Sequence, residues 1–321
     1  MDEERNNWKA WLYLAPVLLL MAVFTFYPIL STFVVSFMKD YDSLDGSSSG
    51  FSFFNYGYVL GISANNDVGI TNNDFFSWNS PSAFSNTMFI TFVTVPISVI
   101  LALVIAVAIH SIKALRNFFQ TVFFMPYVTN VIAIGMVFGV LFSNNGVFNK
   151  IFGLTTPWLD SGSATWGSCM FVLCLYIIWT ALPYKILIFL SGLQGIDQQY
   201  YDAARVDGAG KLKASLKITI PLLSPQILYI TVTSFISGFK EYSSIVGLLG
   251  RSYSSDANTH DLYTIVYYIM DIIRPDDSTA GAGAASTGKI QFACAAAVIL
   301  FLIILIFTVI ELQISKKKVV Y

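Results

Sequence analysis

Two charged side chains, Lys240 and Glu241, lie inside a long apolar stretch of the sequence and stand close to a run of small polar residues. The residues spaced i, i+3, i+4 and i+7, which would share one helix face, are Ser234, Ser237, Gly238 and Glu241. Hydroxyl groups, open backbone and one carboxylate offer both the donors and the acceptors that a polyhydroxylated solute requires. The spacing therefore predicts a binding face for such a solute.

A structural interpretation of the same residues stands beside this one. Serine and glycine commonly line tight helix contacts in membranes, and a Lys–Glu pair can be satisfied inside the protein. Lys185 is the third charge well within an apolar stretch. Because a charge inside a membrane segment is costly, all three are candidates for a functional role.

The composition indicates the environment of these residues. Of the 321 residues, 55% are hydrophobic and 12% are charged, against about 25% charged in average soluble domains. The net charge of -1 gives no basic surface for nucleic acid. Cys169, Cys174, Cys294 and the two histidines have no metal-ligand spacing, so no metal site is expected. The chain is expected to lie in a lipid bilayer.

Six stretches have the roughly 20 apolar residues that a membrane-crossing helix needs. They are residues 11–37, 87–109, 118–142, 167–190, 218–249 and 290–314. The excess of Lys and Arg on one side of these spans predicts that both termini are cytoplasmic. We therefore expect an all-α polytopic membrane protein with six transmembrane helices. The expected parts are a cytoplasmic N-terminus (1–10), one membrane domain (11–314) with extracellular loops at 38–86 and 250–289 and a cytoplasmic loop at 194–217, and a basic cytoplasmic tail (315–321).

The segment GAASTGKI (283–290) nearly matches the phosphate-binding pattern G-x-x-x-x-G-K-[ST]. It has Ile290 where a magnesium-binding hydroxyl is required, and it precedes a predicted transmembrane helix rather than following a strand. We interpret it as a flexible loop, so no ATP site is expected there.

A polar stretch at 200–223 separates two apolar segments on the predicted cytoplasmic side. Asp197 can cap a helix that begins at Gln198, and Gly208 can end that helix before a second one begins near Lys211. One face of the first helix would carry Tyr201, Ala204 and Gly208, and its small residues would let another surface approach closely. The other faces would carry Asp202, Arg205 and Asp207. An amphipathic connector lying on the membrane surface is the alternative.

Residues 202–221 read D-A-A-x3-G-x9-I-x-I-P. This pattern resembles the E-A-A-x3-G-x9-I-x-L-P loop of the permease subunits of binding-protein-dependent ABC importers. Asp202 and Ile220 depart from it conservatively, and the spacing is intact. The segments 123–149, 158–166 and 179–210 also resemble sugar-importer permeases of the maltose type.

The resemblance implies a type I ABC importer permease fold, in which this loop is a coupling helix that docks on an ATPase. The ATPase-coupling residues implied are Asp202, Ala203, Ala204, Arg205, Asp207, Gly208 and Pro221. The implied partners are a second homologous permease, two cytoplasmic ATPase subunits that bind ATP and Mg, and an extracellular solute-binding protein. The chain itself would be a transport subunit of a prokaryotic plasma membrane, with no cofactor of its own and no enzymatic activity.

The resemblance also implies that sugar contacts come from the fifth span and from the W-x-x-x-P-Y segment of the fourth, with the third span contributing by the same analogy. The substrate-binding residues implied are Tyr127, Asn130, Trp179, Thr180, Tyr184, Ser234, Ser237, Gly238, Lys240 and Glu241. Tryptophan and tyrosine also form interfacial belts in membranes, which is the alternative for Trp179 and Tyr184. Ile177 and Gly238 stand where the family example has amides, so the substrate can differ from maltose, and the nearby cation leaves acidic saccharides open.

Two other classes of protein compete with an importer permease. An autonomous secondary transporter of a polar solute would carry ionisable coupling residues on several spans and paired repeats. A membrane enzyme would need a convergent catalytic cluster. The sequence shows neither pattern, and the secondary transporter stays as the alternative.

Overall fold

The computed structural model describes residues 7–42, 45–62, 75–76, 82–112, 116–159, 163–250, 262–273 and 290–315. The helices are α1 (Asn7–Met21), the π-helical turn η2 (Ala22–Phe26), α2 (Tyr27–Ser36), α3 (Phe54–Val59), α4 (Ala83–Ser111), α5 (Arg116–Val128), α6 (Val131–Leu141), α7 (Val147–Phe152), α8 (Trp166–Gln194), α9 (Gln198–Val206), α10 (Lys211–Ala214), the π-helical turn η3 (Ser215–Thr219), α11 (Ile220–Leu222), α12 (Ser224–Phe239), α13 (Ser243–Leu249), α14 (Ile265–Ile273) and α15 (Ile290–Ser315). Strands β1 (Met38–Lys39) and β2 (Gly50–Phe51) pair antiparallel. The chain forms two compact units, residues 1–75 with 268–301 and residues 76–267 with 302–321.

Within the described residues, four helices are long and apolar enough to cross a membrane, and two bent helix pairs raise the number to six if each pair counts as one span. The four helices are Trp11–Ser36, Ala83–Ser111, Trp166–Gln194 and Ile290–Ser315. The bent pairs are Phe118–Val128 with Val131–Leu141, at 99°, and Lys211–Leu222 with Ser224–Phe239, at 67°. The predicted all-α architecture is confirmed, and the third and fifth predicted spans fall on bent helix pairs instead of single helices.

The first unit contains the N-terminal span and a small extramembrane segment. The most apolar 18 residues of Trp11–Ser36 bury no side chain within the chain, as expected for a helix covered by lipid. The π-helical turn η2 ends at Phe26, two residues before Pro28, whose ring nitrogen has no proton to donate to the helix ladder. The Asn55 amide donates to the carbonyl of Ser36 at 2.9 Å and to that of Met38 at 2.8 Å, so α3 is tied to the end of α2.

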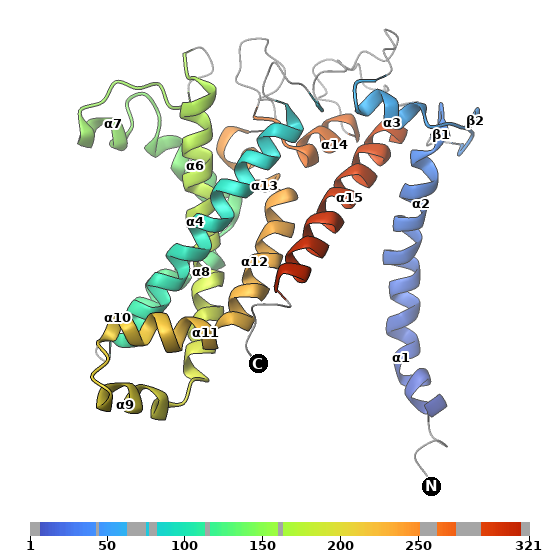
Figure 1. Ribbon diagram of the computed structural model, residues 1–321. Helices are drawn as coiled ribbons and strands as arrows, with labels where there is room; N and C mark the ends of the chain where they lie inside the picture. The colour runs from blue at the N-terminus through green and yellow to red at the C-terminus, as the bar shows by residue number, and fades with distance from the viewer. Residues whose placement is uncertain are drawn as a thin grey trace. The chain divides into compact units, whose positions relative to one another are not determined.

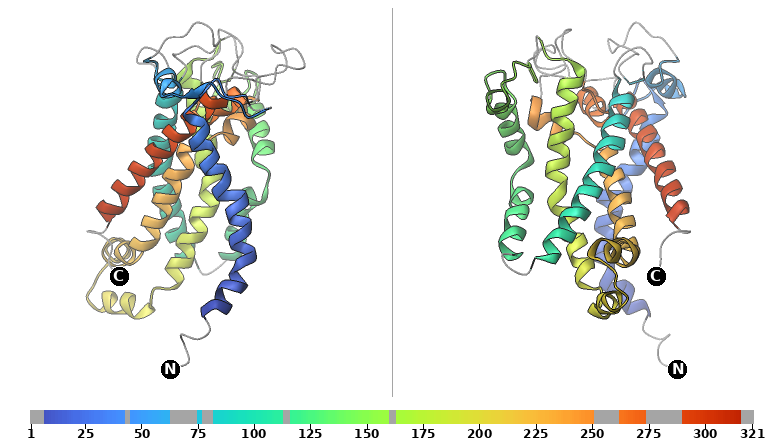
Figure 2. Two further views of the ribbon diagram at one scale, coloured as in Figure 1. Left: turned by 90° about the vertical axis from the view of Figure 1, so that its right-hand side faces the viewer. Right: turned by 60° about the vertical axis from the view of Figure 1, so that its left-hand side comes forward.

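The second unit is built on α4 and α8, and α12 also packs against both helices (Figures 1 and 2). Both long helices begin with a capping box, formed by Ser82 with Ser85 in α4 and by Thr165 with Ser168 in α8. Each has 29 residues, or about 43 Å at 1.5 Å per residue, which exceeds the hydrocarbon thickness. The two helices therefore extend beyond the hydrocarbon core or tilt across it.

The third predicted span, 118–142, is not one continuous helix. Pro126 lies inside α5, and the chain turns at Thr129 and Asn130 before α6 begins. Thr129 Oγ1 donates to the carbonyl of Met125, and the Tyr176 hydroxyl donates to the carbonyl of Val131. Hydroxyl groups thus replace part of the helix ladder at the break.

The fifth predicted span, 218–249, also differs from the structure. Helix α12 ends at Phe239, and α13 is a separate short helix that packs against α6. The contact is a glycine crossing, because a Cβ atom added at Gly135 would lie 2.9 Å from Cα of Gly247 and still closer to its carbonyl group. Glu241 follows the end of α12, so the predicted single helix face that includes it is wrong.

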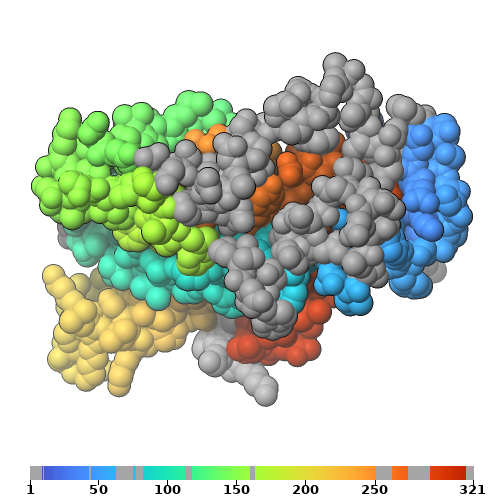
Figure 3. Space-filling model, turned by 90° about the horizontal axis from the view of Figure 1, so that it is seen from above, coloured from blue at the N-terminus to red at the C-terminus, as the bar shows by residue number. Residues whose placement is uncertain are grey.

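Helices α7 and α9 lie at opposite ends of the second unit (Figure 1). Seen from above, the atoms of α6 and α7 form one edge of this unit (Figure 3). The phosphate-loop look-alike at 283–289 and residues 251–261 and 274–282 of the predicted second external loop lie outside the described residues.

Candidate functional site

The second unit contains a cavity of about 720 Å³, within the range of small-molecule sites. Its walls come from α4, α5, α8, α12, the break after α5, and the turn that leads into α13. The lining residues are Thr94, Val95, Ser98, Pro126, Tyr127, Thr129, Val131, Ile177, Thr180, Ala181, Tyr184, Lys185, Thr233, Ser234, Ser237, Gly238, Lys240, Glu241, Tyr242, Ser243 and Ser244. Hydroxyl groups and backbone thus surround a space between helices.

The structure brings most of the predicted substrate residues together around this cavity. Those that line it are Tyr127, Thr180, Tyr184, Ser234, Ser237, Gly238, Lys240 and Glu241. Asn130 is not among them, because its side chain accepts from the backbone N–H of Ile132 at 2.8 Å and caps α6. Trp179 does not line the cavity either, and its ring packs against Phe138 with 5.5 Å between ring centroids. Asn130 and Trp179 therefore contact other parts of the protein instead of the cavity.

Sequence reasoning missed the contribution of α4 to the wall. Thr87, Thr91, Thr94 and Ser98 are all buried, and their spacing places them along one side of this apolar helix. Thr87 is used in packing, since its Oγ1 accepts from the backbone N–H of Ile265 at 3.0 Å. Thr94 and Ser98 reach the cavity. Hydroxyls repeated every three or four residues in an apolar helix were the signal in the sequence.

Tyrosine side chains line another part of the cavity. The rings of Tyr127 and Tyr184 stack with their centroids 6.1 Å apart and their planes 16° apart. The Tyr184 and Tyr229 hydroxyls lie 3.2 Å from each other. This wall offers phenol hydroxyls beside aromatic faces, a combination of polar and apolar contact within one site.

Lys240 and Glu241 do not form the internal pair that was the structural alternative. Within the described part of the chain, no ion pair joins these two side chains, and Lys240 is exposed. Glu241 Oε1 accepts from the backbone N–H of Ser244 at 3.0 Å, so the carboxylate caps the start of α13. Its backbone carbonyl accepts from the Thr264 hydroxyl at 2.7 Å. Glu241 therefore holds the turn that shapes one cavity wall.

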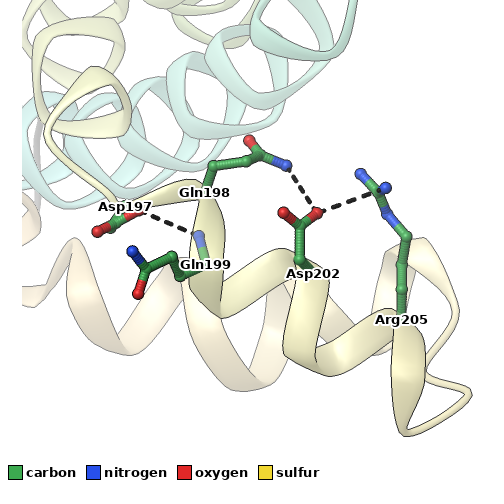
Figure 4. Close-up of polar contacts among 5 residues, drawn as sticks. All are labelled: Asp197, Gln198, Gln199, Asp202 and Arg205. Atoms are coloured by element: carbon green, nitrogen blue, oxygen red, sulfur yellow. Dashed lines mark hydrogen bonds and ion pairs between the residues drawn. The ribbon is translucent and has the colours of Figure 1, made fainter.

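The second candidate region is the polar segment around α9. Asp197 caps this helix by accepting from the backbone N–H of Gln199 at 3.1 Å (Figure 4). One oxygen of Asp202 lies 3.5 Å from the Gln198 amide nitrogen and 3.5 Å from the Arg205 guanidinium (Figure 4). Within the described part of the chain, the bonds of Asp197, Asp202 and Arg205 join neighbours of the same helical segment, so they order α9 without covering its outer surface.

Gly208 ends this helical segment as the sequence predicts. Its φ of +71° is a conformation that favours glycine, and a Cβ atom there would have open space around it. Helix α10 begins after Gly210. The bent helix pair predicted for the loop is confirmed.

The face of α9 predicted to receive a partner is only partly exposed. Ala204 is only 8% exposed within this chain, and the Tyr201 hydroxyl lies 3.0 Å from Thr219 Oγ1 in η3. The bond from Tyr201 joins α9 to η3. The surface left open carries Asp202, Ala203 and Arg205, with Val206 89% exposed.

The sequence of the chain matches a known protein family over most of the residues that form this site. Residues 96–319 match the family described as the inner membrane component of binding-protein-dependent transport systems. The chain belongs to this family. The match includes the whole cavity wall except Thr94 and Val95, as well as the α9 segment. The chain is accordingly a multi-pass permease component of an ABC importer rather than an enzyme.

Individual relatives agree with this assignment. The probable ABC transporter permease protein MG188 of Mycoplasma genitalium is 30% identical, over 75% of this chain and 70% of that protein. The lactose transport system permease protein LacF of Rhizobium radiobacter is 28% identical, over 85% of this chain and 86% of that protein.

One solved structure shows the same fold. It is a bacterial alginate ABC transporter in complex with an alginate pentasaccharide-bound periplasmic protein. The likeness has a TM-score of 0.73 and covers 98% of this chain and 96% of that chain, at 16% sequence identity. The predicted type I importer permease fold is confirmed.

Proposed function

We propose that this permease carries a saccharide and that the 720 Å³ cavity is its part of the substrate pathway. The stacked tyrosines Tyr127 and Tyr184 beside serine and threonine hydroxyls carry this proposal. Hydroxyls both donate and accept, as sugar hydroxyls do, and aromatic faces suit the less polar faces of a sugar ring. The names of the lactose and alginate relatives support the same substrate class.

The α9 segment is proposed as the coupling element that docks on a separate ATPase. The residues assigned to this contact are Asp202, Ala203, Ala204, Arg205, Asp207, Gly208 and Pro221. Ala204 is buried, whereas the exposed members of this set are Asp202, Ala203, Arg205, Asp207 and Gly208. Exposed Val206 and Leu212 add apolar surface at the same end of the unit. Apolar surface rimmed by charge is typical of a protein interface.

A continuous path joins α9 to the cavity. Tyr201 bonds to Thr219 in η3, and the chain then runs through α11 into α12, which carries Ser234, Ser237 and Gly238 in the cavity wall. A displacement of α9 would therefore move α12. Coupling requires such an element, whose position biases two global states of the protein.

The complete transporter would contain four kinds of subunit. We propose a second homologous permease, because six spans supply half of a path, with two ATPase subunits that bind ATP and Mg in the cytoplasm. A solute-binding protein would deliver the saccharide, in line with the periplasmic protein in the related complex. The chain would lie in the plasma membrane of a prokaryote with both termini in the cytoplasm. The autonomous secondary transporter is the function that this proposal competes with.

Co-purification tests the proposal. The chain is extracted from its native membrane in a gentle detergent, captured, and its companions are identified by mass spectrometry. Recovery of a second permease, an ATPase and a solute-binding protein is expected. Reproducible recovery of the chain alone would overturn the proposed assembly and favour the self-contained transporter.

A further inference from the structure

The cavity carries an excess of positive charge. Two lysines, Lys185 and Lys240, line the cavity together with one carboxylate, that of Glu241. Because the Glu241 carboxylate accepts from the N–H of Ser244 at the start of α13, part of its capacity is used inside the protein. The balance of charge therefore favours an anion in the cavity.

Lys185 is the better placed of the two lysines. It projects from α8, is 5% exposed, and its Nζ donates to Oγ of Ser98 on α4. The direction of this bond follows from the Ser98 hydroxyl, which donates its own proton to the carbonyl of Thr94 at 2.6 Å. The ammonium group is thus anchored between the two longest helices of the unit.

The ammonium group has binding capacity left over. A lysine has three N–H donors, and among the described residues only Ser98 lies within hydrogen-bond distance of Nζ. No carboxylate of the described chain forms an ion pair with it. A charge that served only to hold membrane helices together would be paired with an opposite charge, whereas an unpaired one facing a polar cavity is typical of a solute pathway.

We infer that the substrate of this permease carries an anionic group, a carboxylate or a phosphate, which pairs with Lys185 in the cavity. The inference rests on the proposed function and narrows its substrate class from saccharides in general to saccharides that carry a carboxylate or a phosphate. A neutral saccharide would find enough partners in the hydroxyls of the wall, such as Thr180 and Ser237. A buried ammonium would only add a desolvation penalty for that substrate. Lys240, exposed at the end of α12, is a second cation along the same path.

Matched substrate pairs test the inference. The complete transporter is reconstituted in proteoliposomes, and uptake is measured for digalacturonate against galactobiose, cellobiouronate against cellobiose, and glucose 6-phosphate against glucose. The variants are Lys185→Met, which keeps an unbranched apolar side chain, and Lys150→Met on α7, which removes an exposed lysine outside the cavity. ATP hydrolysis without substrate is recorded for each variant to show that the complex is assembled.

The inference predicts that at least one anionic member is imported in preference to its neutral partner. Lys185→Met should lower that import at least tenfold, and Lys150→Met should leave it unchanged. The anionic pair that is imported distinguishes a carboxylate from a phosphate. Import of neutral members alone, or an anion preference that survives in Lys185→Met, would overturn the inference and leave saccharide import standing. Import of no member by a complex that hydrolyses ATP would overturn both the inference and the proposed function.

Discussion

The cavity and the α9 segment differ in how their residues are arranged and in how far these residues are exposed. The cavity wall combines groups from helices far apart in the sequence, and its central groups, such as Lys185 and Ser98, are buried and bonded across helices. The α9 segment is contiguous in sequence and largely exposed. Asp202 bonds within the helix, and a bond from Tyr201 joins the helix to η3. A small solute binds in a cavity that is largely formed before binding, whereas a partner protein binds to an exposed surface and contributes residues of its own to the interface.

This difference predicts which property each substitution changes. Substitutions where helices cross near the cavity should change the stability of the permease, because packing there is tight. Substitutions on the outer surface of α9 should change coupling to the ATPase while leaving stability unchanged.

Gly208→Pro should abolish coupling. The native φ of +71° is inaccessible to proline, whose ring fixes φ near −65°, so the turn after α9 must be rebuilt. We expect the variant to insert in the membrane but to lose the ATPase on co-purification, together with uptake. Gly210→Ala is the matched control, because Gly210 has a φ of −70° and an added Cβ atom would meet open space there. Normal uptake by Gly208→Pro would contradict the assignment of α9 as the coupling element.

Gly135→Ala should destabilise the permease without affecting α9. The new Cβ would overlap the backbone of Gly247, and overpacking of this kind costs about 1–3 kcal/mol. Thermal unfolding in detergent should show a lower midpoint. Gly139→Ala on the same helix is the control, because its Cβ would lie 3.6 Å from the carbonyl oxygen of Leu248, an ordinary contact. Equal midpoints for the two variants would show that the contact between α6 and α13 tolerates a side chain at the glycine crossing.

Tyr201→Phe should weaken transmission from α9 to α12. The change removes the contact between the Tyr201 hydroxyl and buried Thr219, worth about 0.5–1.5 kcal/mol for a typical hydrogen bond. We expect more ATP hydrolysed per molecule transported, with the ATPase still bound. Tyr200→Phe removes a hydroxyl from the exposed neighbour and is the control. If both variants keep the wild-type ratio, Tyr201 is only a packing residue.

Asp202→Asn should have the smallest effect on stability. Its pair with Arg205 is solvent-exposed, with 58% and 72% of the two side chains accessible, and such pairs contribute about 0–1 kcal/mol. The unfolding midpoint should match that of the wild type, while affinity for the ATPase, measured by titration of the detergent-solubilised permease, should fall. A loss of stability as large as that of Gly135→Ala would show that the outer surface of α9 contributes to stability as much as the helix crossings near the cavity do.

The contiguous region could be predicted from the sequence in most respects. The Asp197 cap, the glycine turn and the second helix depend on local conformational preferences, and the structure has all three. The bond between Tyr201 and Thr219 could not be predicted, because it depends on where η3 lies.

The cavity could be predicted only in part. Residue types identified Glu241, Lys240 and the serines of the fifth span, but the break after Phe239 is set by the packing of α13 on α6 through Gly135 and Gly247. The role of Ser98 depends on its neighbour Lys185, which lies 87 positions away in sequence. Such a contact has no local signature.

Whether this permease depends on a separate ATPase can be measured as uptake of the same saccharide panel in cells that express the whole transporter with either an active or a catalytically inactive ATPase subunit. We expect uptake with the active ATPase and none with the inactive one, at equal amounts of this permease in the membrane. Uptake that persists with the inactive ATPase would contradict this expectation and identify the chain as a transporter that works alone.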